Sequence, residues 1–114
     1  MPQVTINDIF DAARTALEHH GAGSWQAEHV ARATASAESF GNVICGLQYL
    51  ESYCTQLASG RVDGTVTPDI SQPKPAAVLA DAKCGFAQPA FAAGLDTAIK
   101  TAQTQGIALF SVAN

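Results

Sequence analysis

Positive charge is scarce in this sequence. The 114 residues include only 6 Lys plus Arg against 10 Asp plus Glu, which gives a formal net charge of −4. The six cations are scattered between Arg14 and Lys100 and form no basic stripe. Because a protein needs such a stripe to neutralise nucleic-acid phosphates, we expect no nucleic-acid partner.

Long apolar runs are also missing. None approaches the roughly 18 residues of a membrane-spanning helix, and the first residues, MPQVTINDIF, lack the charged-then-apolar order of a signal peptide. We therefore expect no membrane partner and a cytoplasmic location. Alanine accounts for 22 residues, so large apolar side chains are few. This scarcity indicates that another chain covers part of the surface.

Metal and disulfide patterns are absent as well. Cys45, Cys54 and Cys84 are an odd number with no CxxC spacing, which favours reduced thiols. The three histidines (His19, His20 and His29) lack a second ligand at i+3 or i+4, so we predict no metal site. The sequence also contains no GxGxxG, P-loop or HExxH motif.

Three helices are predicted in the first half of the chain. Thr5 and Asp8 form a capping box for a helix over 6–20, with an apolar face at Ile6, Ile9, Phe10, Ala13 and Leu17. Ser24 would cap a second helix over 25–39, and Asn42 a third over 43–59.

The second half has a different texture. Residues 61–78 hold three of the five prolines and predict an extended connection with a short strand near 66–70. A strand at 78–80 follows, then a helix with Pro89 at its first position and an apolar stripe at Phe91, Leu95, Ala98 and Ala102. The run at 107–112 is apolar on both faces, as in a central strand. The predicted fold class is α+β or α/β, with a strand–helix–strand unit that completes a sheet with another chain or segment.

Residues 40–54, FGNVICGLQYLESYC, carry the candidate chemistry. On the predicted third helix, Cys45, Tyr49 and Tyr53 fall at i, i+4 and i+8 and would share one face. The core face would contain Val43, Leu47, Leu50, Cys54 and Leu57. Cys45 would also lie in the first turn, where the helix dipole favours a thiolate. Alternatively, Cys45 is a buried filler and the tyrosines contact another helix.

A family resemblance adds to these inferences. It rests on Gly41 and the helix after it, and on four stretches: YLESYCTQLASGRVDG (49–64), PDISQPKPAAVLAD (68–81), CGFAQPA (84–90) and AIKTAQTQGIALFSVAN (98–114). Over nearly all of 3–114, the chain resembles the N-terminal part of the malate/L-lactate dehydrogenase family outside the Rossmann superfamily. This family includes ureidoglycolate dehydrogenases and Δ1-pyrroline/Δ1-piperideine-2-carboxylate reductases. The resemblance implies an N-terminal helical segment over 1–60, and a connector plus the start of a nucleotide-binding sheet domain over 61–114.

The resemblance also implies roles for particular residues. The family's third helix opens Ser-His-Gly, followed by Arg and Tyr one and two turns later, whereas this chain has Ile44-Cys45-Gly46, Tyr49 and Tyr53. Cys45 would therefore be catalytic in place of the histidine, and Gly46, Tyr49 and Tyr53 would bind substrate. A neutral Tyr49 cannot hold a carboxylate in the bidentate way of arginine. The pattern is most similar to the imino-acid reductase branch.

The resemblance also bears on cofactor and partners. Gly85 and Gln88 would contact NADPH or NADH, which is bound mostly by the rest of the family fold; the alternative is that residues 83–86 form a simple hairpin turn. We expect a second chain carrying that rest, a dimer or higher oligomer, and a small-molecule acid as substrate. The chain would be a truncated piece, a separate subunit, or the product of cleavage after Asn114, whose side-chain amide can attack its own carbonyl.

Three functions follow as hypotheses. The first is the N-terminal chain of an NAD(P)H-dependent reductase of 2-oxo or cyclic 2-imino acids. The second is a non-catalytic scaffold that lacks the family's Ser-His-Arg set. The third is a shifted chemistry, of the lyase or hydrolase kind, that uses Cys45.

Overall fold

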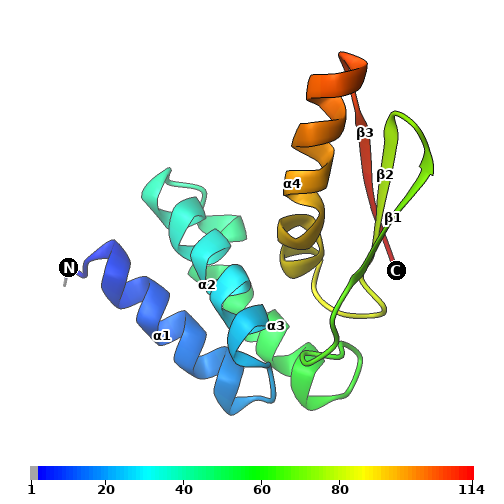
Figure 1. Ribbon diagram of the computed structural model, residues 1–114. Coiled ribbons are helices and arrows are strands. Elements are labelled where there is room, and N and C mark those ends of the chain that lie inside the picture. The colour runs from blue at the N-terminus through cyan, green and yellow to red at the C-terminus, as the bar shows by residue number, and fades with distance from the viewer. Residues whose placement is uncertain (1–2) are drawn as a thin grey trace. The chain divides into compact units, whose positions relative to one another are not determined.

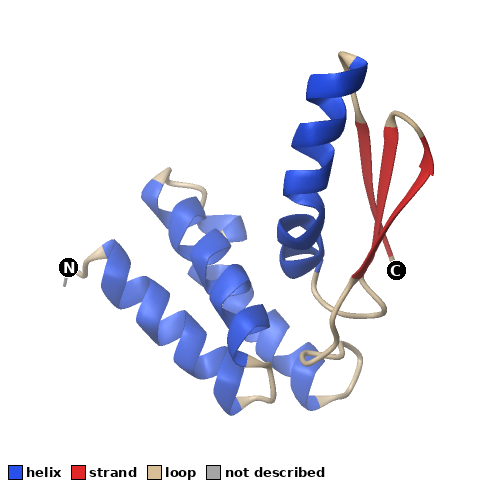
Figure 2. Ribbon diagram, in the orientation of Figure 1, coloured by secondary structure: helices blue, strands red, loops and turns tan. Residues whose placement is uncertain are grey.

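The structure is a computed structural model that describes residues 3–114. The chain divides into two compact units, which meet in the sequence between Thr65 and Val66. The first is helical and the second mixes helix and strand (Figure 2). The second contains one helix and three strands. We call them the helical unit and the sheet unit.

The first helix, α1 (Ile6–His19), matches the predicted helix over 6–20 closely. Its capping box is complete: the Asp8 backbone N–H donates to Thr5 Oγ1 at 3.1 Å, and the Thr5 N–H donates to Asp8 Oδ2 at 3.2 Å. These bonds satisfy N–H groups that a helix start leaves unpaired. Of the predicted apolar face, Ile9, Ala13 and Leu17 are buried, whereas Ile6 is exposed.

The second helix, α2 (Ser24–Ser39), begins one residue earlier than predicted. The predicted cap at Ser24 is wrong, because Gly23 occupies the cap position and no side chain caps the helix. Instead, the Gly23 N–H donates to the Gly64 carbonyl oxygen at 2.9 Å, which ties the helix start to the end of the unit. The buried face of α2 contains small residues, Ala27, Ala31 and Ala35, which allow helices to approach closely.

The predicted third helix over 43–59 is interrupted. Val43–Cys45 form a short 3₁₀ turn, η1, and α3 (Leu47–Ala58) begins only after Gly46. Asn42 caps η1 alone, since its Oδ1 accepts from the Cys45 N–H at 3.4 Å. The core stripe holds only in the second half of this segment, where Cys54 and Leu57 are buried; Val43 and Leu47 are exposed.

The sheet unit contains β1 (Asp69–Lys74), β2 (Ala77–Asp81), α4 (Ala87–Gln105) and β3 (Leu109–Ala113). The strand order is β1-β2-β3 (Figure 1). β1 and β2 form an antiparallel hairpin, whereas β2 and β3 are parallel and joined through α4. The predicted strand–helix–strand order is therefore confirmed, and the strand expected near 66–70 lies a few residues later.

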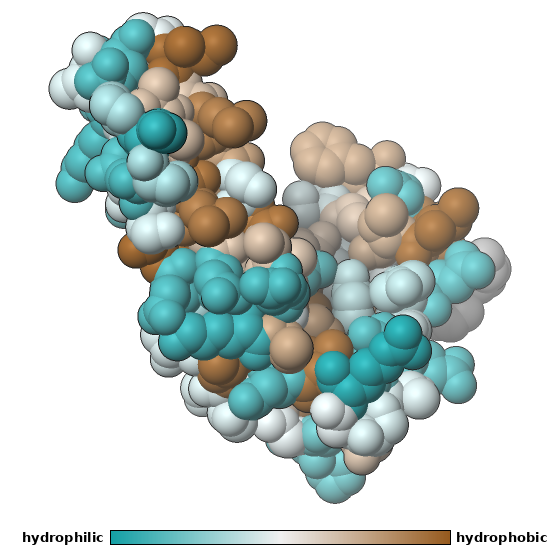
Figure 3. Space-filling model, turned by 90° about the vertical axis from the view of Figure 1, so that its right-hand side faces the viewer, coloured by the Kyte–Doolittle hydropathy of each residue, from teal (hydrophilic) through white to brown (hydrophobic). Residues whose placement is uncertain are grey.

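The last strand has a partner on one side only in the described part of the chain. β3 pairs with β2, so it is an edge strand here, whereas its sequence predicts a central strand. Its apolar residues are accordingly exposed: Leu109 by 68% and Val112 by 38%. Figure 3 shows hydrophobic side chains gathered along one side of the sheet unit. An edge of this composition favours coverage by further structure.

The buried face of α4 includes Ala98 of the predicted stripe but differs from it at the two large residues. Phe91 is half exposed and Leu95 is exposed as well, whereas Gly94 and Thr101 are buried. The reason is Phe110 on β3, whose ring packs against Gly94: a Cβ at Gly94 would lie 2.7 Å from Phe110 Cζ. Pro89 is the third residue of the helix and not the first, because α4 starts at Ala87.

Candidate functional site

Cys45 is the last residue of η1, and its side chain is exposed. The next residue, Gly46, has φ −95° and ψ −138°, so the backbone leaves the helical conformation between Cys45 and α3. The predicted stack of Cys45, Tyr49 and Tyr53 on one helical face is therefore wrong for Cys45. Because Cys45 is outside α3, the dipole of that helix does not favour its thiolate in the way predicted for a residue of the first turn.

A carboxylate from α2 explains this break. Glu38 Oε1 accepts a hydrogen bond from the Leu47 backbone N–H at 2.7 Å, so Glu38 caps the start of α3. Gly46 is buried under the same side chain, and a Cβ at Gly46 would lie 2.7 Å from Glu38 Cγ. Only glycine leaves room for this approach. Glu38 is not predictable from the sequence, because the contact spans nine residues and has no local motif.

The two tyrosines remain neighbours on α3, as the sequence predicts. Their ring centroids are 4.9 Å apart, with an interplanar angle of 69°. This edge-to-face arrangement is a favourable geometry for an aromatic pair. Tyr49 is 44% exposed, and Tyr53 is half-buried. Tyr49 is therefore accessible to a ligand from solvent.

Tyr49 lines a polar hollow of about 690 Å³ on the helical unit. Arg61 and Glu51 line it too, and in residues 3–114 neither makes an ion pair. An unpaired guanidinium can hold a carboxylate through two parallel hydrogen bonds. Arg61 is thus a candidate carboxylate-binding residue that the sequence analysis overlooked. The remaining lining residues are Gln48, Ser52, Thr55 and Gln56.

Cys54 differs from the other two cysteines. It is only 8% exposed, whereas Cys45 and Cys84 are exposed, and all three thiols are free. Burial raises the pKa of the Cys54 thiol, because an apolar environment disfavours the thiolate. Cys54 is therefore a core residue, as predicted.

Gly85 and Gln88 lie at the connection from β2 to α4. Residues 83–86 therefore lead from a strand into a helix and do not form a hairpin turn, the alternative left open by the sequence. The Gly85 N–H donates to the Ala82 carbonyl oxygen at 2.8 Å, and Gln88 is the second residue of α4. Phe86, before the helix, contributes no side-chain cap. Backbone N–H groups at a helix start favour an anionic group such as a cofactor phosphate.

Asn114 is close to this connection. Its side-chain Nδ2 donates to Asp81 Oδ1 at 3.2 Å, and its carbonyl oxygen accepts from the Cys84 N–H at 2.8 Å. These contacts give Asn114 a structural role in the sheet unit. The cleavage expected at Asn114 stays a prediction.

Two negative observations concern the described residues. Within 3–114, no group of three His, Cys, Asp or Glu side chains is placed to hold a metal ion. None of the helices in the same range combines the length and the apolar character that a membrane crossing requires.

Comparison with known proteins decides the family. The model of the malate/L-lactate dehydrogenase family matches residues 4–114, which is nearly the whole chain. The chain belongs to the malate/L-lactate dehydrogenase family. The resemblance inferred from the sequence is thereby confirmed, and the chain is placed in a family of oxidoreductases.

Relatives in this family include reductases and a dehydrogenase. The chain is 33% identical over 112 residues to the Δ1-pyrroline-2-carboxylate/Δ1-piperideine-2-carboxylate reductase of Pseudomonas putida, covering 98% of this chain and 33% of that protein. It is 32% identical over 111 residues to the (2R)-3-sulfolactate dehydrogenase (NADP(+)) of Chromohalobacter salexigens, covering 96% and 32%. The chain thus spans about a third of the length of the curated relatives it matches.

Solved structures of the family share this fold. The Δ1-piperideine-2-carboxylate reductase of Pseudomonas syringae pvar. tomato matches with a TM-score of 0.93 and 33% identity, over 98% of this chain and 34% of that one. Malate dehydrogenase of Pyrococcus horikoshii OT3 matches with a TM-score of 0.86 at 23% identity, over 99% and 33%, and supports the fold alone. The mixed α and β fold class predicted from the sequence is confirmed.

Proposed function

We propose that this chain forms the N-terminal part of a nicotinamide-dependent reductase of 2-oxo acids or cyclic 2-imino acids of the Δ1-pyrroline- or Δ1-piperideine-2-carboxylate kind. The observation that carries the proposal is the similarity to the Pseudomonas syringae reductase, which combines a TM-score of 0.93 with 33% identity. The rest of the family fold completes the site. The setting would be cytoplasmic, with a dimer or higher oligomer as the active form.

The exposed side chains of the helical unit would handle the substrate. Cys45 would exchange a proton with the reacting nitrogen or oxygen, acting as a general acid or base. Tyr49 and Tyr53 would line the substrate, and Gly46 would keep the backbone close to it. Arg61 lines the same hollow as Tyr49. It would bind the substrate carboxylate in place of the arginine that the family pattern has at position 49.

The cofactor would meet the sheet unit at Gly85 and Gln88. NADPH or NADH, when bound, supplies the hydride. The position of Gly85 and Gln88 at the start of α4 supports this placement, because backbone N–H groups at a helix start attract phosphate. The greater part of the cofactor would be held outside residues 1–114.

One observation favours a second candidate, a non-catalytic scaffold. Cys45 lies outside α3, and α3 carries Tyr49 where the family pattern has arginine. Neither the imidazole nor the guanidinium expected from the family is therefore present on this segment. A scaffold would oxidise no reduced nicotinamide with any 2-oxo or imino acid.

A chimera separates the two candidates. Residues 3–114 replace the matching third of the Pseudomonas syringae reductase, and NADPH oxidation is measured with Δ1-piperideine-2-carboxylate. The reductase proposal predicts turnover that Cys45→Ala lowers at least about tenfold, since a positioned acid or base contributes roughly 10²–10⁴-fold. The matched control is the triple variant Ile44→Ser/Cys45→His/Tyr49→Arg, which restores the family residues. An inactive chimera with an active triple variant would establish the scaffold.

Mass spectrometry tests the remaining predictions. Native and denaturing spectra of the purified protein would show a second chain, and a new terminus after Asn114, if the chain is cleaved there. A single continuous polypeptide that includes both family portions would exclude cleavage and a second chain alike.

A further inference from the structure

Three residues with an unusual backbone gather at one edge of the sheet unit. In the described part of the chain, the non-glycine residues with positive φ are Lys83 (52°), Cys84 (64°) and Asn114 (63°). Lys83 and Cys84 follow the end of β2, and Asn114 follows the end of β3, so all three lie where these parallel strands end. Such conformations are unfavourable for residues with a side chain and concentrate at functional sites. The surrounding structure must therefore hold them.

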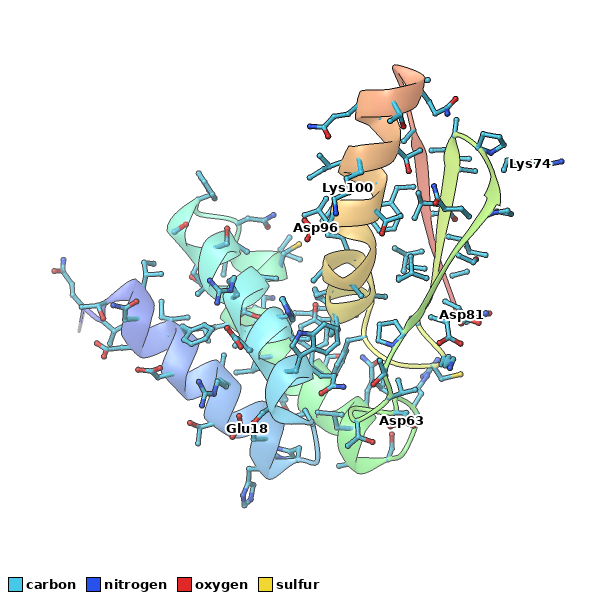
Figure 4. All side chains as sticks on the ribbon, viewed as in Figure 1. Glu18, Asp63, Lys74, Asp81, Asp96 and Lys100 are labelled. Carbon is cyan, nitrogen blue, oxygen red and sulfur yellow. The ribbon has the colours of Figure 1, made fainter. Side chains whose placement is uncertain are left out.

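Asp81, the last residue of β2, makes the contacts that hold this edge. Its Oδ1 accepts two hydrogen bonds, from the Lys83 backbone N–H at 2.9 Å and from Asn114 Nδ2 at 3.2 Å. The Cys84 N–H completes the link by donating to the Asn114 carbonyl oxygen at 2.8 Å. One carboxylate thus joins the left-handed turn after β2 to the residue after β3. Figure 4 shows Asp81 at this edge.

Charged side chains also lie at this edge. Asp69 of β1 lies opposite Asp81 in the strand register, and its Oδ2 is 2.6 Å from Lys83 Nζ. The backbone hydrogen bond from Lys83, followed by the amide of Asn114, lowers the pKa of Asp81 below its usual range. The carboxylate is therefore ionised at neutral pH, the form that accepts both bonds.

We propose that Asp81 is the positioning residue of the turn 82–86, and that it presents Gly85 and the first turn of α4 to the cofactor. The contact with the cofactor rests on the proposed function, whereas the role of Asp81 in positioning the turn does not. Asp81 acts through Lys83 and Cys84. By holding both in the left-handed conformation, it directs the chain from the end of β2 into α4, where Gly85 and Gln88 lie.

The test uses the thiol of Cys84 as a reporter in the full 114-residue chain. Iodoacetamide alkylation of Cys84 is followed by peptide mass mapping, with exposed Cys45 of the helical unit as the internal control. Asp81→Ala, which removes the acceptor of both hydrogen bonds, is expected to raise the Cys84/Cys45 rate ratio and the hydrogen-exchange rate of the Cys84 amide about tenfold. Asp81→Asn keeps an acceptor oxygen and should stay within about twofold of the wild type. Asp69→Asn, the matched control, removes a carboxylate from the same edge without touching these hydrogen bonds and should behave likewise.

Two outcomes overturn the positioning role: unchanged Cys84 values in Asp81→Ala, or equal increases in Asp81→Asn and Asp81→Ala. If Asp81→Ala fails to fold, Asn114→Gly decides instead. It deletes the amide but permits positive φ, and an unchanged Cys84 ratio in it would refute the link to β3, whereas an increase supports it.

NADPH titration of the chimera with the Pseudomonas syringae reductase, which supplies the rest of the family fold, tests the cofactor contact separately. Amide signals of Gly85 and Ala87 should shift in the unsubstituted chimera and not in the chimera with Asp81→Ala. Without a shift in the unsubstituted chimera, the cofactor contact of the proposed function is wrong at this turn, while the Cys84 ratio still decides the role of Asp81.

Discussion

The two units of the chain are built by different means. The helical unit buries branched side chains, with Leu17 and Val30 fully buried, and side chains cap the starts of α1 and α3 but not that of α2. In the sheet unit, Val78 is fully buried too, but most of the other buried residues are small, and Phe110 packs against a cluster of three buried alanines, Ala80, Ala82 and Ala90. The helical unit also carries the whole net charge of −4, because the sheet unit has three acids and three bases. Because most buried residues of the sheet unit are small, its helix and strands approach closely and tolerate little added volume.

The candidate residues of both units nevertheless share one arrangement. In each, a carboxylate fixes a change of backbone direction beside an exposed cysteine and a glycine. Glu38 does so for Cys45 and Gly46, and Asp81 does so for Cys84. Glu38 acts from another helix, whereas Asp81 acts on the turn that directly follows it. Single substitutions in the core of each unit would test whether the different cores also respond differently in their free energy of unfolding.

The largest effect is expected in the core of the helical unit. Leu17→Ala leaves a cavity at a fully buried position and should lower the free energy of unfolding by about 2–5 kcal/mol. Trp25, the one tryptophan of the chain, lies on α2 and reports unfolding by fluorescence during urea denaturation. The control Leu109→Ala deletes an exposed leucine on β3 and should change the same transition by less than about 0.5 kcal/mol. Equal losses from the two variants would contradict the assignment of the core.

The sheet unit should be sensitive to added volume instead. Gly94→Ala places a methyl group 2.7 Å from the Phe110 ring, and overpacking of this kind costs about 1–3 kcal/mol. Alanine recovers about 1 kcal/mol of helix propensity over glycine, so the net loss should be smaller than this range. Hydrogen exchange of β2 and β3 amides measures it. In a Phe110→Leu background the same substitution should become neutral or stabilising, and a persistent loss there would exclude the ring as the cause.

A smaller effect is expected at the start of α3. Glu38→Ala removes the cap of Leu47 and should cost about 1 kcal/mol, the usual value for a lost helix cap. Gly46→Ala should cost a similar amount, because its Cβ displaces the Glu38 side chain. The two share one interaction, so the double variant should cost hardly more than either alone. Glu38→Gln, which keeps an acceptor oxygen, serves as the control; additive losses would show that the two residues act independently.

The sequence predicted elements well where local signals decide them. The capping box at Thr5 and Asp8 located α1, and the strand–helix–strand order followed from the pattern of apolar runs. The errors lie where a distant residue decides. Glu38 interrupts the predicted third helix from nine residues away, and Phe110 determines which face of the alanine-rich α4 is buried. Small side chains carry little periodic signal, so the face of such a helix depends on its partner.

The candidate site divides in the same way. Tyr49 and Tyr53 were correctly placed side by side, because helical spacing alone brings them together. The position of Cys45 relative to them was wrong, since it depends on the break at Gly46. No local sequence pattern marks Asp81 or Arg61. Asp81 acts on the turn that follows it and on the end of β3, which comes much later in the chain, and Arg61 lies just beyond the end of α3.

The smallest effect is expected at Cys54, the buried cysteine. Its reactivity, set against that of Cys45, compares the interior of the helical unit with its surface. Burial raises the pKa of Cys54, so iodoacetamide should modify Cys54 more slowly than Cys45 and require a higher pH.

Because the folded pKa lies above the unfolded value of about 8.5, the neutral thiol contributes stability that is present below that pH and is lost as the pH rises through the folded pKa. Cys54→Ala should remove this alkaline loss and leave the profile below pH of about 8 parallel to that of the wild type. Peptide mapping of the alkylated thiols from neutral to alkaline pH checks the order. If Cys54 were modified as fast as Cys45 near neutral pH, α3 would open locally without unfolding of the helical unit, and the site residues Tyr49 and Tyr53 on the same helix would then share that mobility.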